Sequence, residues 1–429
     1  MKFYSTRNKE KMFSLPEAVL GGLAADGGLY VPATDFKDIS KRTDACSLKE
    51  VANELLTPFC LEDFTKAAIA QMIEAAFNFP LPVIELQKKL FVCELFHGPT
   101  LAFKDFGGRF IAQIMSRCMQ QQTGKLQILV ATSGDTGSAV ASGFYRLPNI
   151  EVIILYPEGK VSPLQEKQLT TYGENITAVK VKGSFDTCQQ LVKQAFNDTD
   201  LANQVNLSSA NSINIGRLLP QMIYYGAVAR QMLEATGKKA TMVVPSGNFG
   251  NLMAGLMALK MCEPIKHFIA AVNANKVVPD YLASGFYQPQ SSIQTLSNAM
   301  DVGAPSNLER IQWLYKNNVD EMKTDFNSVS ITDEQTLVAM KETYANYGYI
   351  ADPHTCVAIA AHKKIESQGP VVIMSTAHPA KFKETVEQTL GMDIKLPPQL
   401  EIIAKKESHA LQIDAEYASL KKIILSGKN

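Results

Sequence analysis

The sequence predicts an α/β fold with two open, mostly parallel sheets that follow a mostly helical N-terminal region. Short apolar runs alternate with helix-like segments, which is typical of strands covered by helices on both faces. The alternation occurs in two separate series along a chain of 429 residues, a length too great for one ordinary core. We therefore expect an N-terminal domain (1–90), a smaller α/β domain (91–235) and a larger α/β domain (236–429).

The N-terminal region carries helix-start signals. Ser14 and Ser47 each stand three residues before a glutamate, which is the spacing of a capping box. A longer amphipathic stretch covers residues 61–77 and stops at the proline-rich break at 80–82. This pattern predicts a separate, mainly helical N-terminal domain or cap.

The two later series define the expected sheets. In the first series, strands are expected at 90–95, 127–131, 152–156 and 176–181, and helices near 105–122, 137–146, 162–172 and 184–196. In the second, strands are expected at 241–245, 267–272 and 371–375, and helices near 213–236, 252–262, 332–345, 354–366 and 380–390. Residues 276–330 lack clear periodicity, so we predict loops with one helix around Trp313.

Composition excludes several classes of partner. Lysine plus arginine equals aspartate plus glutamate at 42 each, so nothing indicates binding to nucleic acid or to a membrane surface. The seven cysteines are scattered without a C-x-x-C pair, which indicates reduced thiols rather than a disulfide framework or a zinc site. No apolar run approaches the ~18 residues of a membrane span. We expect a cytoplasmic protein without a metal site.

Lys104 is the first candidate for chemistry. It follows an apolar Leu-Ala-Phe run and opens a predicted helix. A lysine among apolar neighbours loses hydration, so its pKa falls and its free amine becomes a nucleophile suited to Schiff-base chemistry with an aldehyde cofactor. The alternative interpretation is a solvated lysine that only opens a helix.

Two strand–loop–helix units, residues 128–137 and 242–251, are candidates for anion binding. In each, a buried strand ends in small residues and glycines, so that backbone N–H groups and the dipole of the next helix can face an anion. Neither loop matches a dinucleotide or nucleotide-phosphate signature. The alternative is that both loops are plain turns and that Asp135 is a helix cap.

A third unit, residues 371–382, brings the hydroxyls of Ser375 and Thr376 to a helix start. Ligand binding and simple N-capping both explain this pattern. His378 precedes a proline at the same helix start, and we interpret it as structural rather than as a general base.

Taken together, the motifs resemble those of the threonine synthase family. That family comprises enzymes that use pyridoxal 5′-phosphate (PLP) and have the tryptophan-synthase β-subunit type of fold, known as PLP fold type II. The resemblance covers nearly the whole chain, and the long motif around Lys104 is similar to the subgroup with an N-terminal domain. The matching stretches are 22–32, 97–107, 132–137, 207–214, 246–251 and 375–381. The resemblance implies conversion of O-phospho-L-homoserine and water to L-threonine and phosphate.

The resemblance also implies a role for each matching residue. Lys104 would bind PLP covalently and transfer protons, and Thr376 would face the pyridine nitrogen. The cofactor phosphate would lie on the loop of Gly247, Asn248, Phe249, Gly250 and Asn251, where we expect Gly250 to need a positive φ. The substrate carboxylate would lie on Ser133, Gly134, Asp135 and Thr136. Beyond the resemblance, we expect a second anion site for the substrate phosphate, drawn from Lys160, Ser184 and Asn211 together with that loop. The alternative for Lys160 is a solvated lysine in a loop.

Two other functions stay open at this stage. A PLP-dependent dehydratase or phospholyase that releases 2-oxobutyrate shares the fold and the early chemistry. A PLP-binding protein without catalytic activity is the other alternative. The sequence leaves a monomer and a homodimer equally open.

Overall fold

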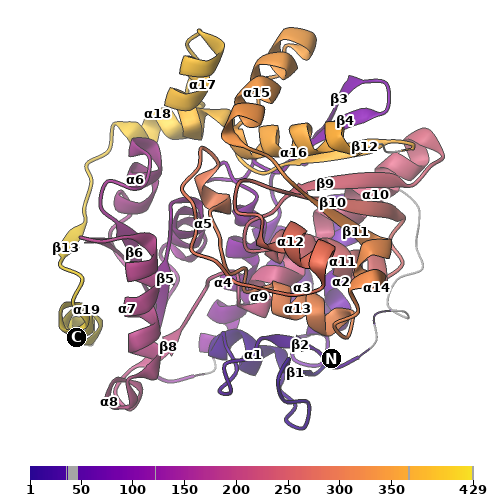
Figure 1. The fold of residues 1–429 in the computed structure, drawn as a ribbon. Helices are drawn as coiled ribbons and strands as arrows, with labels where there is room; N and C mark the ends of the chain where they lie inside the picture. The colour runs from indigo at the N-terminus through magenta and orange to yellow at the C-terminus, as the bar shows by residue number, and fades with distance from the viewer. Residues whose placement is uncertain (35, 37–46, 121, 366–367, 428–429) are drawn as a thin grey trace.

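The computed structural model describes residues 1–34, 36, 47–120, 122–365 and 368–427 (Figure 1). Within these residues the chain forms a six-stranded sheet, a five-stranded sheet and a two-stranded ribbon near the N-terminus. The strand order is β11-β10-β9-β12-β4-β3 in the large sheet and β13-β7-β6-β5-β8 in the small sheet. The predicted α/β fold with two sheets is confirmed.

The strands of the large sheet are β3 (Val83–Gln87), β4 (Leu90–Glu94), β9 (Ala240–Pro245), β10 (Ile265–Val272), β11 (Phe326–Ser330) and β12 (Val371–Ser375). Those of the small sheet are β5 (Leu126–Ala131), β6 (Ile150–Pro157), β7 (Ile176–Val181), β8 (Asn206–Ser208) and β13 (Leu411–Ile413). The ribbon consists of β1 (Phe3–Ser5) and β2 (Tyr30–Pro32). Neighbouring strands run parallel in both large assemblies, except that β3 and β4 form an antiparallel pair.

The helices before and around the small sheet are α1 (Leu15–Gly21), α2 (Leu48–Cys60), α3 (Lys66–Ala76), α4 (Lys104–Met119), α5 (Asp135–Phe144), α6 (Pro163–Thr170), α7 (Phe185–Asn197), α8 (Thr199–Ala202), α9 (Ile215–Leu218), η2 (Leu219–Gln221) and α10 (Met222–Thr236). The later helices are α11 (Gly250–Lys260), α12 (Val277–Ser284), η3 (Asn298–Met300), α13 (Leu308–Leu314), α14 (Val319–Asp325), α15 (Asp333–Tyr347), α16 (Pro353–Lys364), η4 (Pro379–Phe382), α17 (Lys383–Leu390), α18 (Pro398–Ala404) and α19 (Tyr417–Ser426).

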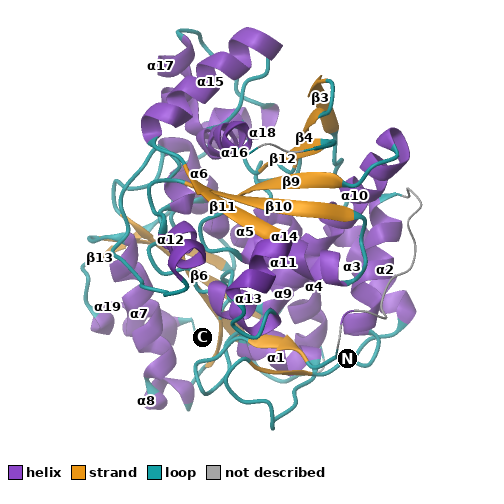
Figure 2. Ribbon diagram, turned by 45° about the vertical axis from the view of Figure 1, so that its right-hand side comes forward, coloured by secondary structure: helices purple, strands orange, loops and turns teal. Residues whose placement is uncertain are grey.

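The central strands have helices on both faces. In the large sheet, α16 contacts β9, β10 and β12, while α10 and α11 contact strands of the same sheet from the other side (Figure 2). Every residue of β5, β9 and β12 is therefore buried. Their mostly apolar sequences are typical of parallel strands covered on both faces.

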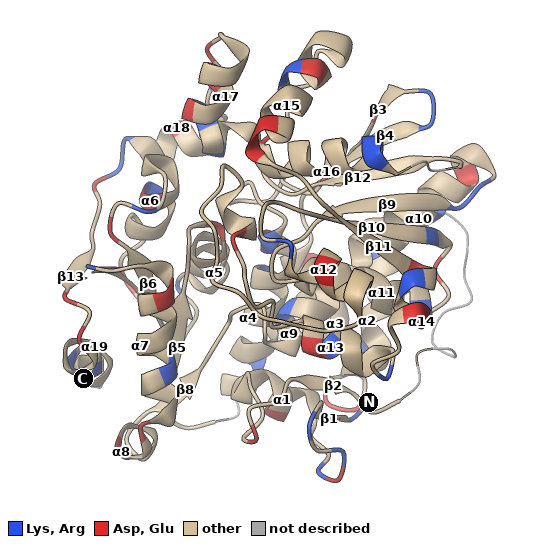
Figure 3. Cartoon of the chain, in the orientation of Figure 1, with Lys and Arg blue, Asp and Glu red and all other residues tan. Residues whose placement is uncertain are grey.

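The N-terminal region packs on the rest of the chain. The predicted capping boxes at Ser14 and Ser47 are both present, and they begin α1 and α2. The Arg109 side chain on α4 donates to the Ala76 carbonyl at the end of α3, with Nε 2.9 Å from the oxygen. Both signs of charge are spread along the chain without a block of one sign (Figure 3). No helix within the described residues is both long enough and apolar enough to cross a bilayer.

The prediction for residues 276–330 is partly wrong. The helix around Trp313 is confirmed as α13, but the segment also contains α12, α14 and the strand β11. β11 is an edge strand, and four of its five residues are only half-buried. An edge strand does not need the continuous apolar run by which the other strands were found.

Strand pairing crosses the predicted domain boundaries. β4, nearly all of which falls within the predicted 91–235 domain, pairs with β12, so that Val92 faces Ile373 in the large sheet. β13, from the predicted 236–429 domain, pairs with β7 in the small sheet, and the C-terminal α19 lies beside α7 (Figure 1). Hydrophobic periodicity identifies a strand but does not identify its partner. The division into three domains stays a prediction.

Candidate active site

Loops from separate parts of the chain meet at the carboxyl edge of the large sheet. The Lys104 loop follows β4, and the Thr376 loop follows the neighbouring strand β12. Two backbone hydrogen bonds join them: Phe103 N donates to Thr376 O at 2.9 Å, and His378 N donates to Leu101 O at 3.1 Å. Ligands bind at this edge in open α/β sheets.

Lys104 is the first residue of α4, and its side chain is largely buried, with 14% exposed. The pKa of Lys104 is lowered to about 8, chiefly by burial and also by the nearby cations Lys381 and Arg217, while the Asp135 carboxylate opposes the shift. Lys104 Nζ lies 3.9 Å from Asp135 Oδ2. About a tenth of Lys104 is thus a free amine at pH 7, far more than for an ordinary lysine, as the apolar setting predicted.

Asp135 is the first residue of α5 and is buried. Its Oδ1 accepts hydrogen bonds from Lys381 Nζ at 2.7 Å and from Gln165 Nε2 at 2.9 Å. Burial alone would raise the pKa of Asp135, but the charges of Lys381 and Lys104 outweigh it and hold the pKa well below its ordinary value. Asp135 is therefore a charged group of the site rather than only a helix cap.

The loop that precedes Asp135 is fixed by Thr132, whose Oγ1 accepts from the N–H groups of Gly134 and Gly137, each at 2.9 Å. Gly134 has a φ of +132°, and a Cβ there would lie 2.6 Å from the Gln165 side chain. This position thus requires glycine. Ser133 and Thr136 are only half-buried on either side of it.

The second glycine loop, residues 247–251, precedes α11. Asn248 holds it through two contacts: its Nδ2 donates to Ser212 Oγ at 2.5 Å, and its Oδ1 accepts from Ser306 N at 2.6 Å. The positive φ of this loop, 59°, falls on Phe249, so the expectation that Gly250 needs it is wrong. The chain makes its left-handed turn one residue before the helix begins.

Gly247 and Asn251 show how closely this loop is packed. A Cβ on Gly247 would lie 2.7 Å from the Met300 Cα, because η3 lies directly over it. Asn251 Oδ1 accepts from the hydroxyls of Tyr224 and Tyr225, the latter at 2.8 Å. Asn251 Nδ2 is buried and has no hydrogen-bond partner within the described residues.

These residues fit PLP. The first turn of α11 has no side-chain cap, so its N–H groups can face a phosphate, and the Asn251 amide offers a further buried donor. Lys104 provides the free amine that an aldehyde requires. Thr376 is nearly buried beside the Lys104 loop, where its hydroxyl can serve a ring nitrogen.

The three residues predicted for the substrate phosphate lie in different settings. Asn211 Nδ2 donates to the Ala131 carbonyl at the end of β5 at 3.2 Å, and its buried Oδ1 has no partner within the described residues. Lys160 is exposed in the turn after β6. Ser184 is exposed and caps α7 together with Thr187. In the described part of the chain, no contact joins Lys160 or Ser184 to Lys104 or Asp135.

Sequence reasoning did not assign roles to Lys381, Gln165 and Arg217. Gln165 completes the capping box of α6 with Ser162, and its amide also reaches Asp135. Lys381 lay at the end of a matching motif and Arg217 just beyond one, and their burial was the missing signal. His378 is structural, as predicted, because its Nδ1 accepts from Ala380 N at 3.1 Å and burial lowers its pKa to about 4.

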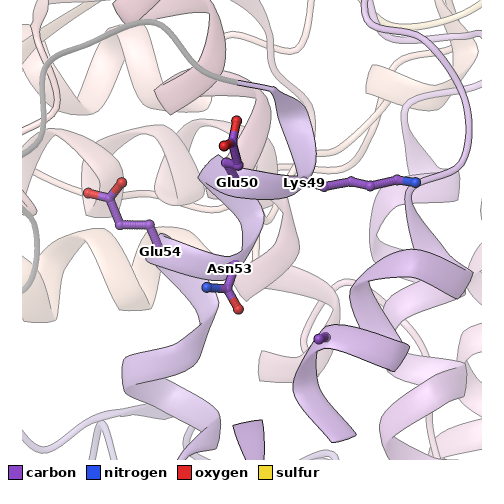
Figure 4. A pocket seen from close by; sticks show the side chains of 5 residues that line it. Lys49, Glu50, Asn53 and Glu54 are labelled. Atoms are coloured by element: carbon purple, nitrogen blue, oxygen red, sulfur yellow. The ribbon is translucent and has the colours of Figure 1, made fainter. Parts of the chain in front are cut away.

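A separate surface hollow of about 660 Å³ lies on α2 and α3 (Figure 4). Its lining residues are Lys49, Glu50, Asn53, Glu54 and Ala70. The set contains no predicted site residue.

Comparisons with known proteins cover the whole chain. The model of the family described as pyridoxal-phosphate dependent enzyme matches residues 78–377, flanked by matches to the threonine synthase N terminus at 2–77 and to its C-terminal part at 355–424. A threonine synthase of Serratia marcescens is 42% identical, with 99% of each chain covered. The crystal structure of Escherichia coli threonine synthase is 40% identical with a TM-score of 0.89 and full coverage of both chains. The structure of PLP-bound threonine synthase from Brucella melitensis is 32% identical with a TM-score of 0.94, again over both full chains.

Proposed function

The chain belongs to the threonine synthase family of pyridoxal-phosphate-dependent enzymes, and we propose that its site around Lys104 converts O-phospho-L-homoserine and water to L-threonine and phosphate. The enzyme is a PLP-dependent lyase of threonine biosynthesis. The observation that carries the assignment of the site is the buried amine of Lys104, with its pKa lowered to about 8, beside the Asp135 loop.

PLP, when bound, supplies an electron sink for negative charge at the α-carbon of an amino acid. Lys104 has a pKa close to working pH, so its amine can take a proton from the substrate and return it. Asp135 and Lys381 fix the loop that receives the substrate carboxylate through the N–H groups at the start of α5. Thr376 offers a neutral hydroxyl to the pyridine nitrogen, which tempers the electron sink because a hydroxyl cannot stabilise a charged ring as a carboxylate does.

The overall reaction balances without an oxidant or a reductant. Phosphate leaves the γ-carbon of the substrate, water supplies the hydroxyl at the β-carbon, and the protons removed are returned to carbon or to phosphate. For the substrate phosphate we retain Lys160, Ser184 and Asn211 as proposed ligands. Asn211 is supported by its contact with the end of β5. Lys160 and Ser184 are supported by their positions after β6 and β7 at the carboxyl edge.

We infer a cytoplasmic monomer or homodimer. The location is supported by unpaired, buried thiols such as those of Cys60 and Cys93, whose pKa values burial raises far above the ordinary value. Thiols of this kind suit a reducing compartment.

The test of the reaction measures threonine, 2-oxobutyrate and phosphate separately from O-phospho-L-homoserine in oxygen-18 water. We expect threonine with the label in its hydroxyl, in a near one-to-one ratio with phosphate. Phosphate accompanied mainly by 2-oxobutyrate would instead identify a phospholyase. Bound PLP without turnover of phosphohomoserine, threonine or serine would identify a protein without catalytic activity.

A further inference from the structure

Lys381 is a fully buried lysine that sequence reasoning left without a role. Its side chain has no exposed surface, and its Nζ lies 2.7 Å from Asp135 Oδ1 and 2.9 Å from Thr100 O. A lysine ammonium that leaves water loses several kcal/mol of hydration, so a position like this is kept where charged and polar partners compensate. Both partners of Lys381 belong to the candidate site.

The position of Lys381 joins three loops. It lies on η4, directly after the Thr376 loop of the large sheet. Asp135 begins α5, which follows β5 of the small sheet, and Thr100 lies in the loop that leads into Lys104. A single ammonium group thus connects the Thr376, Asp135 and Lys104 loops across the two sheets.

The distances from Asp135 to the two nearby lysines show which lysine compensates its charge more strongly. Asp135 lies between two lysines, with Lys381 at 2.7 Å and Lys104 at 3.9 Å. Charge attraction falls with distance, and of the two lysines only Lys381 is within hydrogen-bonding range of Asp135. The charged groups that act on Lys104 come from three other elements: Asp135 on α5, Lys381 on η4 and Arg217 on α9. Lys104 therefore faces a carboxylate whose charge is largely compensated.

We propose that Lys381 is a positioning residue that holds the Asp135 loop against the Lys104 loop and compensates the Asp135 charge, so that Lys104 keeps a free amine. The inference rests on the proposed role of Lys104 in the reaction. The role of Lys381 explains how the Asp135 carboxylate can lie beside Lys104, although a nearby carboxylate by itself would favour the protonated form of that lysine. Without Lys381, the full charge of Asp135 would stabilise the Lys104 ammonium.

The direction of each change follows from these charges. Lys381→Met removes a cation and leaves Asp135 with Lys104 as its nearest cation, so the pKa of Lys104 rises above about 8. Asp135→Asn removes the carboxylate, so that pKa falls. Lys381→Arg keeps the charge and is expected to behave much more like the wild type than Lys381→Met does.

The experiment measures the pKa of Lys104 in the PLP-free protein. Trace acetylation with acetic anhydride between pH 6 and 10, followed by mass spectrometry of the Lys104 peptide, gives the fraction of free amine without any turnover. We expect Lys381→Met to slow labelling of Lys104 at pH 7 by about tenfold, since a pKa rise of about one removes nine-tenths of the free amine there. Lys182→Met is the matched control, because Lys182 pairs with Asp414 at 2.9 Å on the exposed surface.

The outcomes separate cleanly. Wild-type labelling in a folded Lys381→Met protein would overturn the inference, as would equal slowing in Lys182→Met. If Lys381→Met does not fold, Lys381→Gln takes its place, because it removes the charge but keeps a hydrogen-bond donor, and wild-type labelling of Lys104 in that protein would likewise overturn the inference. The proposed function fails differently: hydride reduction of the PLP-loaded enzyme would then place the cofactor on a lysine other than Lys104.

Discussion

The two glycine loops of the site are built alike and charged differently. Each follows a fully buried strand, and each opens a helix whose N-cap residue makes no side-chain hydrogen bond to the first turn. The loop after β5 carries Asp135, which contacts Lys381 and lies near Lys104. The loop after β9 carries only neutral side chains, and its amides Asn248 and Asn251 are bound to hydroxyls and to a backbone N–H.

In the proposed roles, one type of backbone serves two purposes. A phosphate dianion is attracted to bare N–H groups and to a helix dipole, so a carboxylate in the loop after β9 would oppose it. Near Lys104 the charges must instead keep the pKa of the lysine close to working pH. The Asp135 carboxylate and its compensating partner Lys381 are the charged groups that act on this pKa. Breaking each loop should therefore damage a different function.

Lys104→Ala should have the largest effect, because it removes the amine that lies beside Asp135 and that is proposed to bind PLP and transfer protons. We expect kcat/KM to fall by at least about a thousandfold. Hydride reduction of the wild-type enzyme should attach the cofactor to the peptide that contains Lys104. A label on another lysine, or a fully coloured and hydride-labelled Lys104→Ala protein, would remove Lys104 from the role.

Asp135→Asn makes the first loop neutral like the second. It leaves the buried Lys381 without its carboxylate, so we expect a loss of about 3 kcal/mol in the free energy of unfolding at pH 7. The pKa of Asp135 is depressed in the folded protein, so its stabilisation is full above the ordinary value of about 4 and is lost as the pH falls below it. In urea unfolding, the difference in the free energy of unfolding between variant and wild type should therefore be smaller at pH 3 than at pH 7. An unchanged difference would contradict this account.

Gly247→Ala tests the neutral loop by packing alone. The added Cβ would lie 2.7 Å from the Met300 backbone, so the loop must move and PLP affinity should fall by roughly tenfold. Gly250→Ala is the matched change, because a Cβ there meets the Asn307 side chain at 3.2 Å and its three nearest neighbours are all side-chain atoms. Its effect on the PLP dissociation constant should be clearly smaller. Wild-type PLP affinity in Gly247→Ala would place the phosphate elsewhere.

Thr376→Val should have the smallest effect of the set. It removes one hydroxyl at nearly constant volume, so kcat should fall by a few-fold to about tenfold while PLP occupancy stays near that of the wild type. Occupancy is read from the absorbance of the bound cofactor, and kcat from threonine formation. A loss of PLP in step with the loss of turnover would make Thr376 a structural residue of the loop after β12.

Much of this protein follows from the sequence. The capping boxes, the buried strands and Lys104 at a helix start are set by residues a few positions apart, because local backbone preferences and burial patterns act over that range. The order of the motifs also indicated the family, and the wider comparisons confirm it.

Tertiary structure alone decided which segments meet. The sequence predicted β4 as a strand and gave no indication of β13. Strand pairing placed each of them in a sheet with strands from the other side of an expected domain boundary. Lys381 looked like any helix-start lysine, yet it bonds to Thr100, 281 residues away, and compensates Asp135. A charge acts through space on whatever lies within a few ångströms, so its partner and its pKa are fixed only when the fold brings the two loops together.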